Sequence, residues 1–161
     1  MATAFFAGSF NPFTRGHASI VERALPLFDR IIIGVGVNAL KPCAALQGRA
    51  RADAIRALYA DEPRVEVTVY DTLPVEAARR AGATVLLRGV RSVADFEYER
   101  AMSALNRRID GMETLLLFAE PELECVSSSV VRELQSYGRD VSDFLPPAPH
   151  TPQANDNDKN K

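Results

Sequence analysis

Short apolar runs rich in β-branched or aromatic residues alternate along this chain with stretches of helical periodicity. The runs cover residues 4–7, 31–37, 65–70, 84–87 and 114–118, and runs of this length and composition predict buried strands. Strands that alternate with helices are joined by right-handed crossovers, so they lie parallel in one sheet with helices on both faces. The pattern predicts an α/β fold, a Rossmann-like doubly wound sheet of five parallel strands in a single domain. Ligands of such sheets bind outside the carboxyl ends of the strands.

Two of the intervening stretches show the helical pattern clearly, because their apolar residues recur every three or four positions. The predicted apolar faces are Ile20, Val21, Ala24, Leu27 and Phe28 in the first, and Ala54, Ile55, Leu58 and Tyr59 in the second. These faces are expected to cover the sheet.

The composition fits one globular domain. The chain has 161 residues, of which 47% are hydrophobic and 25% charged. A chain of this length can bury a hydrophobic core without disulfide bonds or metal ions to stabilise it. We assign residues 1–148 to this domain. Residues 149–161 follow a proline-rich segment and are polar apart from alanine and proline, so we expect a disordered C-terminal tail.

Charge and cysteine content limit the location and partners of the protein. The net charge of -2 gives no general attraction to nucleic acid or anionic membranes, so neither is expected as a partner. Cys43 and Cys125 lack the spacing of a zinc site. The chain shows no signal peptide and no apolar run of the roughly 20 residues that span a membrane. A cytoplasmic protein with free thiols is therefore expected.

The first predicted strand leads into Gly-Ser-Phe-Asn-Pro-Phe-Thr-Arg-Gly-His, residues 8–17. Its glycines permit close backbone approach, and a helix is expected to begin near Thr14 or Gly16. A helix N-terminus attracts phosphate, and His17 in the first turn can donate to an oxygen that gains charge. The alternative is an ordinary capped turn with a surface histidine.

Further phosphate-binding groups follow other predicted strands. Arg88 and Arg91 present planar donor forks, although a solvated arginine pair bridging Asp95 or Glu97 is the alternative. Lys41, after the second strand, offers a compact positive charge or is a solvated loop lysine. The serines at 127–129 precede a helical pattern, where they can cap the helix and also bind phosphate oxygens.

The segment 8–17 resembles the signature of the nucleotidyltransferase superfamily, and Thr14 together with Pro12 resembles the phosphopantetheine adenylyltransferases. The run Leu-Arg-Gly-Val-Arg-Ser-Val-Ala-Asp-Phe-Glu-Tyr-Glu, residues 87–99, is similar to the same family, and the resemblance extends over residues 6–145. It implies adenylyl transfer from ATP to 4'-phosphopantetheine, which gives dephospho-coenzyme A and pyrophosphate in coenzyme A biosynthesis. It also implies Mg²⁺ bound to ATP and a homohexamer.

The resemblance assigns roles by position, and no residue is assigned as a metal ligand. The implied catalytic residues are His17, Lys41 and Arg91. The implied ATP contacts are Ser9, Phe10, His17, Gly89, Val90, Arg91, Glu99, Leu123, Glu124, Cys125, Val126, Ser127, Ser128 and Ser129. The implied phosphopantetheine contacts are Ser9, Lys41, Leu73, Pro74 and Arg88.

Other readings stay open at this point. A nucleotidyltransferase can act on another phosphorylated acceptor, such as nicotinamide mononucleotide, or transfer a cytidylyl group to glycerol phosphate. Outside this class, the chain can be a non-catalytic nucleotide-binding module or a fragment of an aminoacyl-tRNA synthetase-like fold. The presence of His17 and the lack of net positive charge favour the small-molecule transferase.

Overall fold

The computed structural model describes residues 1–147, and the predicted strands form one parallel sheet. The strands are β1 (Thr3–Gly8), β2 (Arg30–Gly36), β3 (Val65–Tyr70), β4 (Val85–Val90) and β5 (Glu113–Phe118), in the order β3-β2-β1-β4-β5. The predicted five-stranded parallel sheet is confirmed. β4 runs past its expected end at Leu87, because Arg88, Gly89 and Val90 stay in register with β5.

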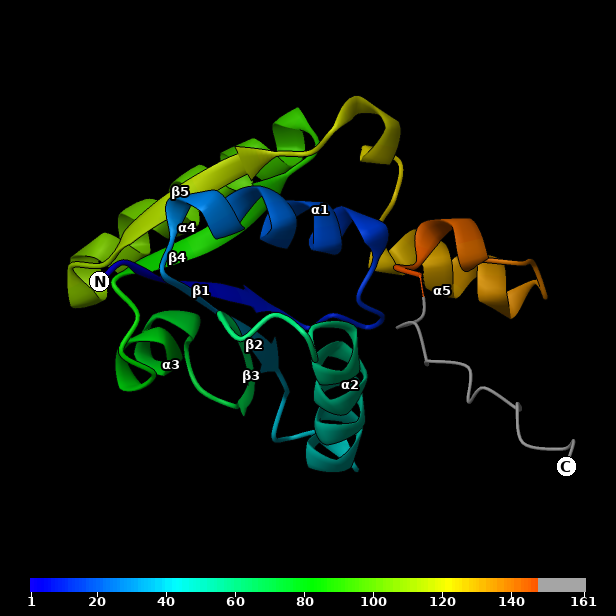
Figure 1. The fold of residues 1–161 in the computed structure, drawn as a ribbon, viewed down its shortest axis with the longest axis horizontal. Coiled ribbons are helices and arrows are strands. Elements are labelled where there is room, and N and C mark those ends of the chain that lie inside the picture. The colour runs from blue at the N-terminus through cyan, green and yellow to red at the C-terminus, as the bar shows by residue number, and fades with distance from the viewer. Residues whose placement is uncertain (148–161) are drawn as a thin grey trace, which may run out of the picture.

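Helices cover both faces of the sheet, as expected for a doubly wound fold (Figure 1). They are α1 (Arg15–Ala24), α2 (Ala44–Leu58), α3 (Pro74–Arg80), α4 (Val93–Asp110) and α5 (Ser128–Ser136), with 3-10 turns η1 (Leu25–Leu27), η2 (Pro121–Leu123) and η3 (Ser142–Phe144). Alternate residues of β1 serve the two faces. Phe6 joins the core under α1 and α2, whereas Phe5 joins the core under α3.

Two residues of the predicted helix faces are placed differently. Leu27 is exposed, because Pro26 stands in the 3-10 turn that follows α1 and a proline cannot donate to an α-helical ladder. Ala54 is also exposed, and Ala52 is buried with Ile55 instead. A helix turns about 100° per residue, which rotates Ala54 away from the side that Ile55 occupies.

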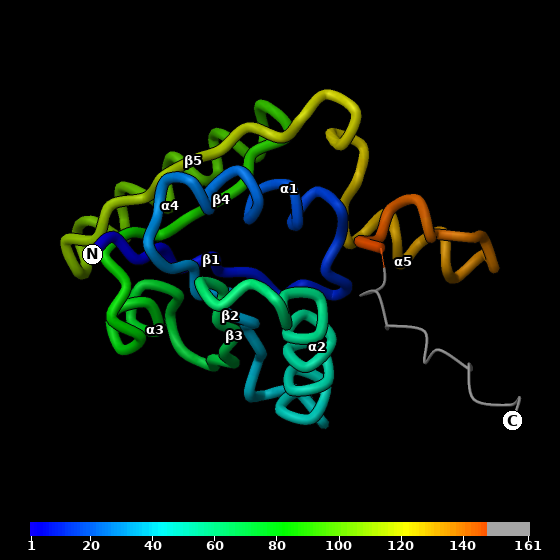
Figure 2. Tube along the Cα trace, viewed as in Figure 1, coloured from blue at the N-terminus to red at the C-terminus, as the bar shows by residue number. Residues whose placement is uncertain are grey.

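The strand order reverses direction between β1 and β4, and this switch opens a crevice at their carboxyl ends. Figure 1 shows α5 beyond the arrowheads of the strands, and Figure 2 shows the chain after β5 passing the start of α1 on its way there. None of the helices within residues 1–147 is long and apolar enough to cross a membrane. The predicted tail, residues 149–161, and its boundary at 148 lie outside the described residues.

Candidate active site

A cavity of about 280 Å³ lies at the switch point. It is bounded by the carboxyl ends of β1 and β4, the start of α1 and the start of α5. The side chains and backbone around it belong to Phe6, Ala7, Gly8, Ser9, Phe10, Thr14, Gly16, His17, Ile20, Arg88, Gly89, Val90, Arg91, Asp95, Ala119, Leu123, Val126, Ser127 and Ser128. Most of the predicted phosphate-binding groups therefore meet in one place, although they come from segments far apart in the sequence.

The turn after β1 depends on the order Gly-Ser-Phe. Phe10 has a left-handed backbone with φ 45°, and its ring is buried. A Cβ at Gly8 would lie 2.8 Å from ring atoms of Phe10, closer than packed carbons approach. Gly8 therefore allows the Phe10 ring to fold back over the strand end. A non-glycine residue in this region of backbone space costs about 1–3 kcal/mol and persists only where its surroundings impose it.

Carbonyl groups of the same loop, residues 8–14, are held by donors from two other helices. The bonds run from Arg51 Nη1 to the Ser9 carbonyl at 2.5 Å, from Arg132 Nη1 to the Asn11 carbonyl at 2.5 Å, and from Ser128 Oγ to the Pro12 carbonyl at 2.7 Å. The loop is thus fixed between α2 and α5. Sequence reasoning missed Arg51 and Arg132, because nothing local relates two helical arginines to a loop far away in the chain.

The hydrogen bond between Thr14 and His17 decides which nitrogen of the imidazole carries its proton. The backbone N–H of Thr14, the N-cap of α1, donates to His17 Nδ1 at 2.9 Å. Because a backbone N–H can only donate, Nδ1 accepts, and the proton of the neutral ring is on Nε2. This pair is part of a capping box in which histidine takes the place of the usual glutamate or glutamine.

His17 is half-buried and packs among aromatic rings. Its ring centroid lies 5.0 Å from that of Phe10, 5.4 Å from Phe13 and 6.2 Å from Phe6. Burial lowers the pKa of His17 to about 4, with a further contribution from the positive charges of Arg88 and Arg91. The imidazole is therefore neutral at physiological pH, and its Nε2–H can donate to an oxygen in the cavity.

The two arginines at the carboxyl end of β4, Arg88 within the strand and Arg91 just after it, already have carboxylate partners. Arg88 donates from Nε and Nη2 to Oε1 of Glu99, at 2.9 and 2.6 Å, and from Nη1 to the Ala7 carbonyl. Arg91 Nε lies 3.2 Å from Oδ2 of Asp95. The alternative reading of the sequence named Asp95 as an arginine partner, whereas neither reading predicted the Arg88–Glu99 pair. Both guanidinium groups line the cavity, so their unused N–H groups can serve an anionic ligand.

The serines at 127–129 have distinct roles. Ser127 is the N-cap of α5, and its Oγ accepts from the Val130 backbone N–H at 3.2 Å. Ser128 binds the loop after β1, and Ser129 Oγ accepts from Arg132 at 3.2 Å. The predicted capping role is confirmed for Ser127. Ser127 and Ser128 line the cavity, but Ser129 does not.

Several predicted site residues lie outside the cavity lining. Lys41 is exposed in the loop between β2 and α2, and Leu73 and Pro74 follow β3, at the edge of the sheet. Because neighbouring strands are about 4.8 Å apart, the end of β3 is roughly 10 Å from that of β1. Glu99, Glu124 and Cys125 are also outside the lining. A ligand that contacts both the cavity and the end of β3 has to span this distance.

Gly16 and Asp95 line the cavity without having been assigned a contact. A Cβ at Gly16 would meet its nearest neighbours, Thr14 Oγ1 and the Val126 carbonyl, at 3.5 and 3.6 Å. Protein packing alone would tolerate alanine there, so the glycine keeps space free in the cavity. The position of Gly16 in the motif of residues 8–17 was the sequence signal that could have identified it as a site residue.

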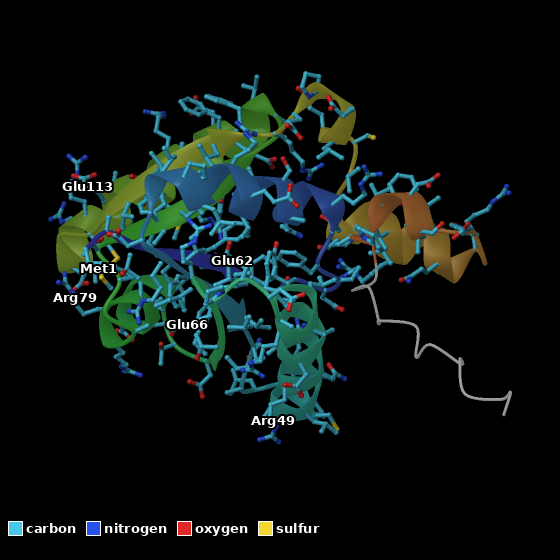
Figure 3. All side chains as sticks on the ribbon, in the orientation of Figure 1. Met1, Arg49, Glu62, Glu66, Arg79 and Glu113 are labelled. Atoms are coloured by element: carbon cyan, nitrogen blue, oxygen red, sulfur yellow. The ribbon has the colours of Figure 1, made fainter. Side chains whose placement is uncertain are left out.

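In Figure 3 the labelled Arg79 and Glu113 lie at the other end of the molecule from α5.

Comparisons with known proteins found similarity over most of the chain. The cytidylyltransferase-like family matches residues 5–134. The chain is 49% identical over 146 residues to the phosphopantetheine adenylyltransferase of Bacteroides thetaiotaomicron, covering 91% of this chain and 96% of that protein. It is 52% identical over 143 residues to the enzyme of the same name from Porphyromonas gingivalis strain ATCC 33277, covering 89% and 93%.

A solved structure shares the fold at low sequence identity. A putative nicotinate-nucleotide adenylyltransferase from Vibrio parahaemolyticus superposes with a TM-score of 0.64 at 18% identity, covering 91% of this chain and 88% of that one. The fold described above is thus one that adenylyltransferases of distant sequence also adopt.

The low pKa of His17 predicts a pH-dependent stability. The unfolded chain takes up a proton at His17 near pH 6.5, whereas the folded protein does so only near pH 4. Between these values the unfolded state binds more protons, so the free energy of unfolding falls as the pH decreases, by up to roughly 3 kcal/mol at 1.36 kcal/mol per pKa unit. His17→Gln keeps a capping-box acceptor at this position but does not titrate. Urea unfolding across this window should show a weaker pH dependence for the variant; equal dependence would contradict the assignment.

Proposed function

Because this chain belongs to the phosphopantetheine adenylyltransferases, within the cytidylyltransferase-like family, we propose that it transfers the adenylyl group of ATP to 4'-phosphopantetheine. The products are dephospho-coenzyme A and pyrophosphate, and the reaction is a step of coenzyme A biosynthesis. The observation that carries this proposal is the neutral, half-buried His17, which presents Nε2–H to a cavity that Arg88 and Arg91 also line.

The transfer is a single in-line displacement. An oxygen of the acceptor phosphate forms a bond to the α-phosphorus of ATP, and the bond from that phosphorus to the bridging oxygen of the β-phosphate breaks. Negative charge gathers on the transferring group and on the leaving pyrophosphate, so the protein contributes positioning and charge stabilisation. In this proposal His17 Nε2–H donates to an α-phosphate oxygen, and Arg91 neutralises the phosphate chain of ATP.

The remaining assigned residues divide between nucleotide and acceptor. We propose that the backbone at Ser9, Phe10, Gly89 and Val90, with Ser127 and Ser128, holds the phosphates and ribose of ATP. The adenine lies toward Leu123 and Val126, which line the same cavity. Arg88 binds the acceptor phosphate, and the pantetheine arm extends toward Leu73 and Pro74 at β3. Lys41 would approach the phosphates by movement of its exposed loop.

Mg²⁺ enters as part of the co-substrate, the ATP complex. Among the described residues no group of three or more histidine, cysteine or acidic side chains is arranged to hold a metal ion, and Asp95 is the acidic side chain of the cavity lining. This arrangement fits an ion coordinated by phosphate oxygens and water, as Mg²⁺ often is. Such an ion neutralises phosphate charge. The protein's own groups then orient the phosphates.

A panel of acceptors tests the substrate assignment. Pyrophosphate release should be fast with ATP and 4'-phosphopantetheine, and slow with nicotinamide mononucleotide or with glycerol phosphate and CTP. The sheet edge at Leu73 can receive a long acceptor arm, which the shorter acceptors lack. If pyrophosphate release is faster with another acceptor, that acceptor is the substrate instead of 4'-phosphopantetheine. If no acceptor gives pyrophosphate release, a non-catalytic binding module is favoured.

Substitution of His17 tests its role in the reaction. His17→Ala should lower kcat by about 10²–10³-fold, the loss typical for one donor to a developing oxyanion. The same change removes the N3 side chain of the capping box at the start of α1. His17→Gln restores an acceptor for the Thr14 N–H, so it separates the helix cap from the imidazole. Near-wild-type kcat in both variants would contradict the role of His17.

We also propose that the protein assembles as a homohexamer in the cytoplasm. An unusual surface of α4 supports self-association: Ala94, Tyr98, Ala101, Leu105 and Ile109 recur at helical spacing and are all exposed. We call these residues the α4 stripe. A helix normally turns such a stripe inward, so a second copy of the chain is its expected cover. Cys43 and Cys125 are free thiols, which suits a reducing compartment.

A charge placed in the α4 stripe should disrupt the assembly. Leu105 is 46% exposed in the single chain, so Leu105→Glu should leave the monomer folded while placing a carboxylate in an apolar interface. Light scattering after size-exclusion chromatography should report a smaller particle. Ala104→Glu is the matched control, because Ala104 is exposed on the same helix but outside the stripe. An unchanged hexamer in Leu105→Glu would place the interface elsewhere.

A further inference from the structure

Glu99 is a buried acid that faces the sheet from α4. It is 7% exposed, and it is one of two buried residues in this helix, the other being Asn106. Its Oε1 accepts from both Nε and Nη2 of Arg88. Glu99 does not line the cavity, whereas Arg88 does. The carboxylate therefore contacts the guanidinium group of Arg88 without lining the cavity itself.

The contacts of Arg88 leave a defined set of donors for that ligand. A guanidinium group carries five N–H donors in one plane. Two of them point to Glu99, and a third, on Nη1, points to the Ala7 carbonyl. One N–H on Nη1 and one on Nη2 remain. With contacts on two sides, the plane of the group is fixed before any ligand arrives.

We propose that Glu99 is a positioning residue that orients Arg88 so that its two remaining N–H groups bind the phosphate of the acceptor. This inference rests on the proposed function, in which Arg88 receives that phosphate. It differs from a direct contact between Glu99 and ATP, the role that family resemblance implies. Oε1 of Glu99 is engaged by two N–H groups of Arg88, so this carboxylate holds the arginine in place.

The burial of the pair explains why an acid is needed at this position. Arg88 is largely withdrawn from water, with a side-chain exposure of 29% against 9% for Glu99. An arginine side chain has many rotamers, and ordering it on binding costs affinity. Glu99 orders it in advance and offsets the cost of its burial. The acceptor phosphate then meets a donor pair that is already in place.

The experiment compares Glu99→Ala, Glu99→Gln and Arg88→Ala in steady-state assays with ATP and 4'-phosphopantetheine. Glu99→Ala should raise the KM for the acceptor about tenfold. This is the effect expected when a misaligned Arg88 loses one hydrogen bond to the charged acceptor phosphate. The KM for ATP should change by less than about twofold. Glu99→Gln is nearly isosteric and keeps one oxygen acceptor, so its acceptor KM should lie between those of the wild type and Glu99→Ala. If Glu99→Ala does not fold, the Glu99→Gln variant still provides the test.

Two controls separate positioning from general damage. Glu97→Gln changes an exposed acid on the same helix, paired with Arg100 at 2.9 Å, and should leave both KM values unchanged. In an Arg88→Ala background, Glu99→Ala should add little to the acceptor KM, because the group it orients is gone.

The outcomes distinguish this inference from the proposed function. If Arg88→Ala raises the acceptor KM but the Glu99 variants raise only the KM for ATP, or neither KM, Glu99 does not position Arg88 and the proposed function still stands. If Arg88→Ala leaves the acceptor KM unchanged, the acceptor site is elsewhere and both fail. An additive effect of the two substitutions would also overturn the inference.

Discussion

The hydrogen bond from the Thr14 backbone N–H to His17 Nδ1 is the interaction on which the rest of the site depends. It caps α1, fixes the tautomer of the imidazole and aims its remaining N–H at the cavity. The aromatic rings around His17 add a second constraint, because they keep the ring neutral. A charged imidazole would bind the triphosphate of ATP strongly before the reaction. A neutral donor gains most when charge develops in the transition state, which is where binding energy accelerates the reaction.

The cavity is rigid because its loop is held from several sides. The loop of residues 8–14 is held by Arg51 from α2 and by Arg132 and Ser128 from α5. Each of these contacts uses a loop carbonyl. Fixed dipoles and donors need no reorganisation when a phosphate arrives, and this preorganisation is the main contribution a protein makes to phosphoryl transfer. The switch in strand order between β1 and β4 provides the opening.

Sequence reasoning predicted the sheet and the groups at its carboxyl ends, because both follow from local patterns. The apolar runs specified five strands, and the motif of residues 8–17 placed His17 in the first turn of a helix. Contacts between distant segments could not be predicted in this way. The partnership of Arg88 with Glu99 depends on how α4 crosses β4, and the Arg132 contact depends on where α5 lies. The prediction for Ala54 was wrong because alanine is a weak indicator of a buried helix face: exposing its single methyl group to water costs little free energy.

In α4 the polar and apolar sides are exchanged relative to a typical surface helix, which buries its apolar side. Its buried residues, Glu99 and Asn106, are polar, whereas the α4 stripe on its outer side is apolar. The fully buried contacts of α4 are therefore polar ones, among them the pair between Glu99 and Arg88. In the proposed hexamer, packing on the α4 stripe would press the helix toward the sheet. The same packing would then steady Glu99, and through it the guanidinium group that receives the acceptor phosphate.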